Sequence, residues 1–160
     1  MATLNGLYPK KGVNEMAIYG NVPIGNARII NRNFAGKEKT YNGRIINPEG
    51  KRNFCVILDA ETAAKMREDG WNVKFPDPEK ELDPFLPVEV SYKNFPPKIV
   101  KVTESGGKTV LSEDNIKDLD WDEIKHIDLV IRPYNYEFNG VSVVKAYCKS
   151  MWVTIEEDFF

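Results

Sequence analysis

The sequence has few of the residues that build covalent cross-links or metal centres. Its 160 residues include two cysteines, Cys55 and Cys148, and a single histidine, His126. A zinc site needs several Cys or His ligands, and a histidine-activated nucleophile needs partner residues beside the ring. We therefore expect no metal and no cofactor. Both cysteines lie in apolar, strand-like stretches far apart in the chain, which favours two buried thiols in a reducing cytoplasm over a disulfide.

The chain also lacks a long apolar run and an excess of either charge. No run approaches the roughly 20 residues of a membrane span, so we expect no membrane partner. The 22 Lys and Arg residues against 24 Asp and Glu give a net charge of −2, which excludes a uniformly basic protein. The charge is uneven, however: residues 1–60 carry +5, residues 61–100 carry −2 and residues 101–160 carry −5. This division predicts either a cationic binding surface with a separate acidic element or solvated faces that differ in charge.

Hydrophobic patterning predicts a mainly β domain with one or two inserted helices. The expected strands are 27–34, 52–58, 71–74, 86–92 and 99–102, followed by a long hairpin over 127–155 that turns at Asn139-Gly140. Residues 35–51 form a long polar loop in this interpretation, with turn signals at Asn42-Gly43 and at 47–50. Residues 1–25 show no lasting period and are expected to form an extended arm. The pattern is typical of a small barrel or sandwich.

Three acidic or polar residues are expected to cap short helices. Asp59 precedes a helix that should end at Gly70, while Ser112 and Asp120 each precede a helical turn. Asp120 and Glu123 have the spacing of a capping box.

Three catalytic or ligand-binding motifs are present only in part. The run 106–109 (Gly-Gly-Lys-Thr) resembles the end of a phosphate-binding loop, but Val102 stands where the first glycine is required. Residues 118–122 hold three aspartates at alternate positions, as calcium loops do, but the glycine and final acid of that motif are missing. The same aspartates leave a metal-dependent nuclease as a minor alternative.

Basic and aromatic residues are interleaved in three parts of the chain. Single-stranded nucleic acid favours this combination, because bases stack on exposed aromatic rings while phosphates need nearby cations. Many strand aromatics must instead pack in the core, and Phe34, Phe54 and Trp71 are the strongest candidates. Tyr41, in a loop rich in Gly and Lys, is the aromatic residue least suited to a core.

The last residues, Glu156, Glu157, Asp158, Phe159 and Phe160, place three acids before two aromatic rings. A terminal carboxylate beside acids is costly to bury, so this tip suits docking into a partner's basic pocket. The alternative is a frayed strand end.

Several short motifs resemble those of a known family. They are Asn33-Phe34-Ala35-Gly36, Gly50-Lys51-Arg52-Asn53-Phe54, Gly70-Trp71-Asn72-Val73-Lys74, Ile131-Arg132-Pro133-Tyr134 and Lys145-Ala146-Tyr147. Spread over about residues 26–155, this pattern resembles the OB-fold single-stranded DNA-binding proteins of phages and prophages of Gram-positive bacteria. The resemblance implies an OB-fold-like, five-stranded, partly open barrel that binds single-stranded DNA in a groove without catalysis.

The tip is similar to the acidic, Phe-ended C-terminus of bacterial single-stranded DNA-binding proteins, which recruits replication and repair enzymes. The chain departs from that pattern because no long Gly/Gln/Pro linker precedes the tip. We therefore expect an arm over 1–25, a DNA-binding domain over 26–155 and a partner-binding tip over 156–160.

The resulting hypothesis is a non-enzymatic, sequence-independent single-stranded DNA-binding protein of phage replication and recombination, acting in the bacterial cytoplasm as a monomer or homodimer. The residues predicted to contact DNA are Arg28, Arg32, Lys37, Lys39, Tyr41, Arg44, Lys51, Arg52, Trp71, Lys74, Arg132, Tyr134, Tyr136 and Lys145. The rival hypothesis is a structural or protein-interaction β-domain whose basic loop contacts protein.

Overall fold

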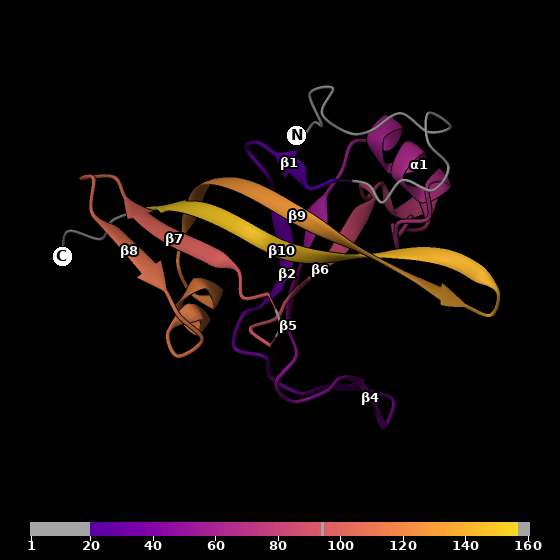
Figure 1. The fold of residues 1–160 in the computed structure, drawn as a ribbon, viewed down its shortest axis with the longest axis horizontal. Helices are drawn as coiled ribbons and strands as arrows, with labels where there is room; N and C mark the ends of the chain where they lie inside the picture. Colours follow the sequence, from indigo (N-terminus) through magenta and orange to yellow (C-terminus); the bar gives the residue numbers. More distant parts are fainter. Residues whose placement is uncertain (1–19, 94, 157–160) are drawn as a thin grey trace.

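The computed structural model describes residues 20–93 and 95–156. Within these ranges the chain forms ten strands, one α-helix and two 3-10 helices (Figure 1). The strands are β1 (Val22–Ile24), β2 (Ile29–Asn33), β3 (Lys39–Tyr41), β4 (Arg44–Asn47), β5 (Arg52–Ile57), β6 (Phe85–Val90), β7 (Lys98–Thr103), β8 (Lys108–Leu111), β9 (Ile124–Phe138) and β10 (Val141–Ile155). The helices are α1 (Ala60–Glu68), η1 (Pro78–Lys80) and η2 (Ile116–Asp120).

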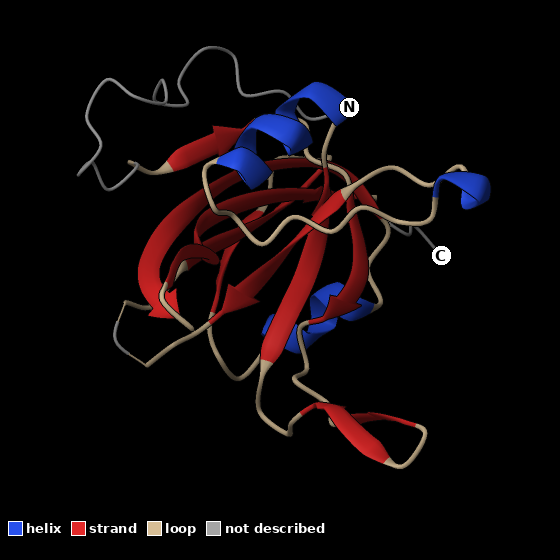
Figure 2. Cartoon of the chain, turned by 90° about the vertical axis from the view of Figure 1, so that its right-hand side faces the viewer, coloured by secondary structure: helices blue, strands red, loops and turns tan. Residues whose placement is uncertain are grey.

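Eight of these strands form one curled sheet that does not close. Its main path runs β1-β9-β10-β6-β5-β2, and β3 and β4 form a separate two-stranded ribbon. The first half of β10 pairs in parallel with β6 at Ala146 and Tyr147, whereas its second half pairs in parallel with β7 over Ser150–Ile155. β8 extends the sheet beyond β7. The mainly β fold with a partly open barrel and short inserted helices is thereby confirmed (Figure 2).

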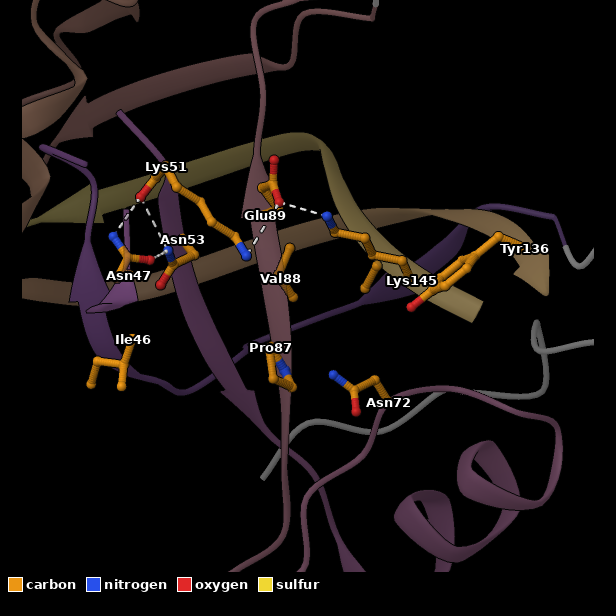
Figure 3. A pocket seen from close by; sticks show the side chains of 11 residues that line it. Ile46, Asn47, Lys51, Asn53, Asn72, Pro87, Val88, Glu89, Tyr136 and Lys145 are labelled. Atoms are coloured by element: carbon orange, nitrogen blue, oxygen red, sulfur yellow. Dashed lines mark hydrogen bonds and ion pairs between the residues drawn. The ribbon is translucent and has the colours of Figure 1, made fainter. Parts of the chain in front are cut away.

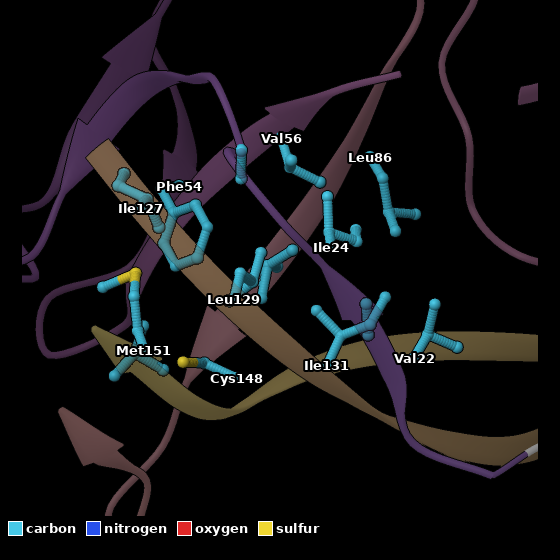
Figure 4. Packing of buried hydrophobic residues seen from close by; sticks show 14 of the residues in the cluster. Val22, Ile24, Phe54, Val56, Leu86, Ile127, Leu129, Ile131, Cys148 and Met151 are labelled. Carbon is cyan, nitrogen blue, oxygen red and sulfur yellow. The ribbon is translucent and has the colours of Figure 1, made fainter. Parts of the chain in front are cut away.

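The core lies on the inner face of this curled sheet (Figure 4). The rings of Phe34 and Phe54 are fully buried and stack with centroids 5.4 Å apart, and Trp71 is only 2% exposed. Burying a large apolar side chain completely stabilises a fold by about 1.5–3 kcal/mol. The predicted core role of these three residues is confirmed.

Both thiols are buried, and neither forms a disulfide, as the sequence predicts. Burial disfavours the charged thiolate, and it raises the pKa of Cys148 from 9.0 to about 12. Burial also raises the pKa of Cys55, against the smaller opposing effects of a hydrogen bond from Asn31 and of nearby lysines.

The β9–β10 hairpin changes its surroundings along its length. Ile127, Leu129 and Ile131 alternate into the core, while the strand beyond Pro133 is exposed. The turn at Asn139-Gly140 has φ values of 52° and 78°, the conformation of a type I′ turn. The predicted hairpin is confirmed, and its distal end projects from the body (Figure 1).

α1 begins where the sequence predicts. The Asp59 carboxylate accepts a hydrogen bond of 2.8 Å from the backbone N–H of Thr62, and the chain leaves the helix at Asp69 and Gly70. Residues 71–74, predicted as a strand, make only two isolated bridges, between Trp71 and Val144 and between Lys74 and Phe85. None of the helices in the described ranges is long and apolar enough to cross a membrane.

Two segments predicted to be irregular contain strands. Val22–Ile24, within the expected arm, pairs antiparallel with β9, while residues 1–19 lie outside the described residues. The long polar loop contains the β3–β4 ribbon, which turns at Asn42-Gly43 with φ values of 49° and 77°. The sequence predicted the turn but not the flanking strands. These strands are short and exposed, and they lack the apolar alternation that marks a half-buried strand.

The prediction that Asp120 caps a helix is wrong. Asp120 ends η2, and its carboxylate accepts hydrogen bonds from the backbone N–H groups of Phe34 (2.7 Å) and Ala35 (3.0 Å). These two N–H groups follow the end of β2 and take no part in its hydrogen bonds to the neighbouring strand. The Asp120 carboxylate therefore serves as their acceptor.

Candidate nucleic-acid interface

A row of five residues crosses the sheet on the face opposite the core. Strand register places Arg132 of β9 beside Tyr147 of β10, then Glu89 of β6, Asn53 of β5 and Asn33 of β2. Because side chains alternate along each strand, neighbours two residues away on the same strands share this face. Tyr134 and Lys145, which are paired on β9 and β10, therefore extend it.

Four adjoining hollows lie along this face, each sharing two residues with the next, and together we call them the groove. The first is lined by Ser91, Phe95, Arg132, Tyr134 and Tyr147. The second shares Ser91 and Tyr147 with it and adds Lys51, Arg52, Glu89 and Tyr92, among others. The third shares Lys51 and Glu89 with the second and reaches Lys145, Asn72 and Tyr136 (Figure 3). The fourth shares Asn72 and Tyr136 with the third and adds Arg67, Lys74, Phe75 and Phe138, among others.

Exposed aromatic rings line the β9–β10 side of the groove. Tyr134 and Tyr136 are 52% and 42% exposed, and their rings lie 6.1 Å apart at an angle of 29°. Tyr147 meets Tyr134 edge-on at 6.1 Å. Rings with open faces at this spacing can each accept a planar base by stacking.

Cations lie among these rings. The Arg132 guanidinium is 4.8 Å from the Phe95 ring centroid and 5.0 Å from that of Tyr147, and the Lys145 ammonium is 4.9 Å from Tyr147. At the far end of the groove, Arg67 lies 4.9 Å from the Phe75 ring. Cation–π contacts of this kind hold the positive charges next to the stacking surfaces.

One carboxylate lies between two of the groove's lysines. The Lys145 ammonium contacts Glu89 Oε1 at 2.7 Å, and the Lys51 ammonium lies 3.9 Å from the same oxygen. The pKa of Lys145 is raised: burial alone would lower it, but the hydrogen bond and negative charge of Glu89 outweigh burial, and Tyr147 adds to the rise. Lys145 therefore stays charged over the physiological pH range.

The second hollow contains the half-buried ring of Tyr92, whose hydroxyl group is buried. The Arg52 guanidinium carbon lies 5.9 Å from the Tyr92 ring, and Arg52 Nη1 is 3.5 Å from the Glu113 carboxylate. Burial raises the pKa of Tyr92 to about 12, so this ring is neutral at every physiological pH.

The β3–β4 ribbon, which we call the wing (39–47), extends from the body beside the third hollow (Figures 1 and 2). It exposes Lys39, Tyr41, Arg44 and the apolar Ile45 and Ile46, and Tyr41 is 68% exposed. Ile46 and Asn47 line the third hollow, so the root of the wing forms part of the groove wall.

A polar cluster fixes the root of the wing. Asn47 Nδ2 donates to the carbonyls of Lys37 (2.9 Å) and Lys51 (3.1 Å), while Asn53 Nδ2 donates 2.7 Å to Asn47 Oδ1. Asn33 bonds both backbone groups of Lys37 at 3.0 Å. The segment that leads into the wing and the segment that leaves it are thus held together by hydrogen bonds of these asparagine amides.

Most of the predicted DNA-contacting residues meet in the groove or on the wing. The structure places Lys51, Arg52, Lys74, Arg132, Tyr134, Tyr136 and Lys145 around the four hollows, and Lys39, Tyr41 and Arg44 on the wing. Arg28 and Lys37 line none of the four hollows, and the Lys37 ammonium lies 5.8 Å from the ring of Trp121 instead.

Two of the predicted contact residues are held by the fold itself. Arg32 Nη1 donates at 2.8 Å to the carbonyls of Leu119 and Asp122, so its guanidinium joins β2 to the end of η2, where carbonyls lack helical partners. Trp71 borders the fourth hollow, but its ring is buried against the core and offers no face for a base.

Sequence reasoning missed several residues that line the groove. Tyr147 belongs to the Lys145-Ala146-Tyr147 motif but was not selected as a contact residue, and Phe75, Phe95, Phe138 and Arg67 were not selected either. The local sequence could have identified Phe95. It lies in a Pro-rich segment between β6 and β7, where an aromatic residue has no partner residue on a paired strand.

The aspartate cluster considered for a nuclease is engaged elsewhere. Asp120 accepts the two backbone N–H groups after β2, and the Asp122 carboxylate pairs with Lys101 at 2.7 Å. Within residues 20–93 and 95–156, no group of three or more His, Cys, Asp or Glu residues is arranged to hold a metal ion.

The expected partner-binding tip is mostly outside the described residues. Glu156 is exposed, and its backbone N–H donates 2.8 Å to the carbonyl of Glu123. Glu157, Asp158, Phe159 and Phe160 lie outside the described residues.

The fold and the groove define a β-rich protein with a partly open barrel and an exposed aromatic and basic face. A family model described as "Putative phage ssDNA-binding domain" matches residues 13–160. The chain belongs to this phage ssDNA-binding domain family, as the resemblance of its motifs suggested. No curated protein matches the sequence significantly.

Solved structures from a bacteriophage share the fold. The single-stranded DNA-binding protein from bacteriophage Enc34 in complex with ssDNA is 16% identical, with a TM-score of 0.52 over 96% of this chain and 98% of that chain. Its C-terminal truncation gives 17% identity and a TM-score of 0.51 over 96% and 97% of the two chains. A further structure of the Enc34 protein gives 15% and 0.52 over 94% and 90%.

Proposed function

We propose that this protein binds single-stranded DNA without sequence specificity, and that the strand lies in the groove with the wing against it. The observation that carries the proposal is the gathering of Tyr134, Tyr136, Arg132 and Lys145 on one exposed face of an open sheet. Family membership and the fold shared with the Enc34 protein, whose structure contains ssDNA, support it.

Each part of the groove contributes a separate interaction in this proposal. Bases stack on the open faces of Tyr134 and Tyr136 and, on the wing, on Tyr41, each contributing about 1–3 kcal/mol. Phosphates lie against cations at the edges of the groove, with Lys51 and Arg52 at the second hollow and Lys74 at the fourth. Stacking accepts any base, so the resulting affinity depends little on sequence.

Binding to a labelled oligo-dT, followed by fluorescence anisotropy, tests the proposal. Single-stranded binding loses about 0.7 units of log K per log unit of salt for each neutralised phosphate, so about four phosphates give a slope near −3. Lys51→Ala should make the slope shallower by about 0.7. Lys125→Ala, which removes an exposed lysine paired with Glu104 outside the groove, should leave it unchanged. Flat anisotropy at low salt and micromolar protein would contradict the proposal and favour a protein-interaction domain.

The cellular role is a proposal of the same kind. We infer that the protein protects single strands during phage DNA replication and recombination in the host cytoplasm, as a monomer or homodimer and without catalysis. Support comes from family membership and from the engagement of Asp120 and Asp122 in structural contacts.

The division into a DNA-binding domain over 26–155 and a tip over 156–160 remains part of this proposal, while Val22–Ile24 of the expected arm over 1–25 pairs with β9. The acidic, Phe-ended tip at 156–160 is proposed to dock on a basic, aromatic-accepting pocket of a replication or recombination protein. Removal of residues 156–160 should abolish co-purification with such a protein without weakening oligo-dT binding. Unchanged co-purification would contradict this role of the tip.

A further inference from the structure

Glu89 is an acidic residue in the middle of a face that otherwise suits an anion. It stands third in the five-strand row, between Tyr147 and Asn53, and it lines both the second and the third hollow (Figure 3). A carboxylate repels phosphate, so a strand that crosses Glu89 places its phosphates elsewhere and turns a base toward this position.

The contacts of Glu89 leave one of its oxygens available. Both lysine contacts, from Lys145 at 2.7 Å and from Lys51 at 3.9 Å, are made to Oε1. Among the described residues no hydrogen bond or ion pair to Oε2 is found, and the Glu89 side chain is 20% exposed. The two ammonium groups offset the charge of the carboxylate, so a neutral base edge can approach it.

The bases differ in what they offer to such an acceptor. In a single strand the Watson–Crick edges are unpaired, and cytosine, adenine and guanine each present an exocyclic amino group that can donate to a carboxylate. Thymine presents only a ring N–H between two carbonyl oxygens, which a carboxylate repels. Tyr136 lines the same hollow as Glu89, so a base stacked there has this acceptor within the hollow.

We propose that Glu89 gives the groove a preference for bases that carry an amino group over thymine. The inference rests on the proposed function, since it requires that single-stranded DNA occupies the groove. Glu89 is then a position at which a surface that otherwise accepts any base distinguishes the bases by the groups on their edges.

The test compares the affinities for oligo-dC and oligo-dT of equal length, at pH 8 and fixed salt, in the wild type and in Glu89→Gln. The measured quantity is the ratio of the two dissociation constants, Kd(dT)/Kd(dC). Removing the negative charge strengthens the binding of both oligomers, and this effect cancels in the ratio. We expect the ratio to fall by about three- to tenfold in Glu89→Gln, since each 1.4 kcal/mol of a base contact corresponds to a factor of ten.

Glu113→Gln is the matched control. Glu113 lines the second hollow and pairs with Arg52, so the substitution removes the same charge from the groove but leaves the row unchanged. Glu113→Gln should keep the wild-type ratio, and Glu89→Ala should reproduce the effect of Glu89→Gln. Thermal melting establishes that each variant is folded.

The outcomes separate the inference from the function on which it rests. Equal ratios in the wild type and Glu89→Gln, with both oligomers bound tightly, would overturn the inference alone. A fall of the same size in Glu113→Gln would also overturn it, because the effect would then be one of charge. Failure of the wild type to bind either oligomer would overturn the proposed function itself.

Discussion

Tyr136 is exposed because it lies on the outward face of β9 with Arg132 and Tyr134, whereas Ile127, Leu129 and Ile131 alternate into the core. Beyond Pro133 the residues of β9 are exposed on both faces, because the hairpin extends past the core. An aromatic ring exposed to solvent beside cations is available to a ligand, because a base can stack on it while the cations hold the neighbouring phosphates.

Tyr136→Ala should weaken binding to oligo-dT by about 5- to 150-fold, the loss expected for one stacked base. Fluorescence anisotropy at constant salt measures it. The matched control is Trp121→Ala, which removes an aromatic residue that is 81% exposed but lines none of the four hollows. Equal losses in the two variants would show that the groove is not the stacking surface.

Cys148 makes the stability of the fold depend on pH. Its pKa is raised to about 12 in the folded state against 9.0 when exposed, so above pH 9 the unfolded state binds fewer protons and stability is lost as the pH rises toward 12. From pH 8 to pH 10 the free energy of unfolding should fall by about 1.4 kcal/mol more in the wild type than in Cys148→Ala. Urea unfolding at both pH values gives this difference. Equal losses would mean that the thiol ionises in the folded state.

Residue identity predicted the core better than it predicted the exposed contacts. Phe54 directly precedes the apolar run 55–58, and Phe34 adjoins the strand that contains Ile29 and Ile30, so their burial could be predicted. The role of Arg32 could not, because its partners are backbone carbonyls in η2 and just after it, 87 and 90 residues away in the chain. A basic side chain that binds phosphate and one that binds carbonyls look the same in a sequence.

The position of the wing is not determined by its own residues alone. It depends on contacts where the chain enters and leaves the wing: the backbone N–H of Gly50 donates 2.7 Å to the carbonyl of Gly36, and the two segments lie side by side. Gly36 has φ +68°, and a Cβ there would be 3.1 Å from the Gly50 carbonyl carbon. Glycine is therefore required at this crossing for both its conformation and its size.

Gly36→Ala should destabilise the protein by about 2–3 kcal/mol, measured by thermal or urea unfolding. Gly43→Ala is the matched control, because Gly43 has a similar φ of +77° but open space around it, and should cost only about 1 kcal/mol. If both substitutions cost the same, then only the backbone conformation matters and the packing at the root does not.

The turn of the wing could be predicted from Asn42-Gly43, whereas its strands could not. Strand prediction relies on apolar alternation, and Lys39–Tyr41 and Arg44–Ile46 are exposed on both faces. The hydrogen bonds that fix the root join Asn33, Asn47 and Asn53, which are separated by turns and carry no periodic signal. The position of the wing beside the groove is therefore a tertiary property.

For the molecule as a whole, the net charge of −2 conceals how the charges are arranged. The basic segment 1–60 supplies Lys51 and Arg52 to the groove, but Arg132 and Lys145 come from the segment 101–160, which carries −5. Folding thus gathers cations from segments of opposite net charge onto one face. The charge blocks predicted that a cationic surface exists, but its location required the strand pairing of β9, β10, β6 and β5.

A second exposed site on the sheet also combines an aromatic ring with a cation. Trp152, on the half of β10 that pairs with β7, has the Lys108 ammonium 5.3 Å from its ring. Trp152 lines none of the four hollows, so the proposed DNA path follows the other half of β10.

Photo-crosslinking of a 5-iodouracil-substituted oligonucleotide, followed by mass spectrometry of the attached peptides, tests this path most directly. Iodouracil couples to aromatic side chains that stack on it, so the groove predicts adducts on Tyr134 and Tyr136, with further adducts on Tyr41 of the wing. Adducts confined to Trp121 or Trp152, with Tyr134 and Tyr136 unmodified, would contradict the account.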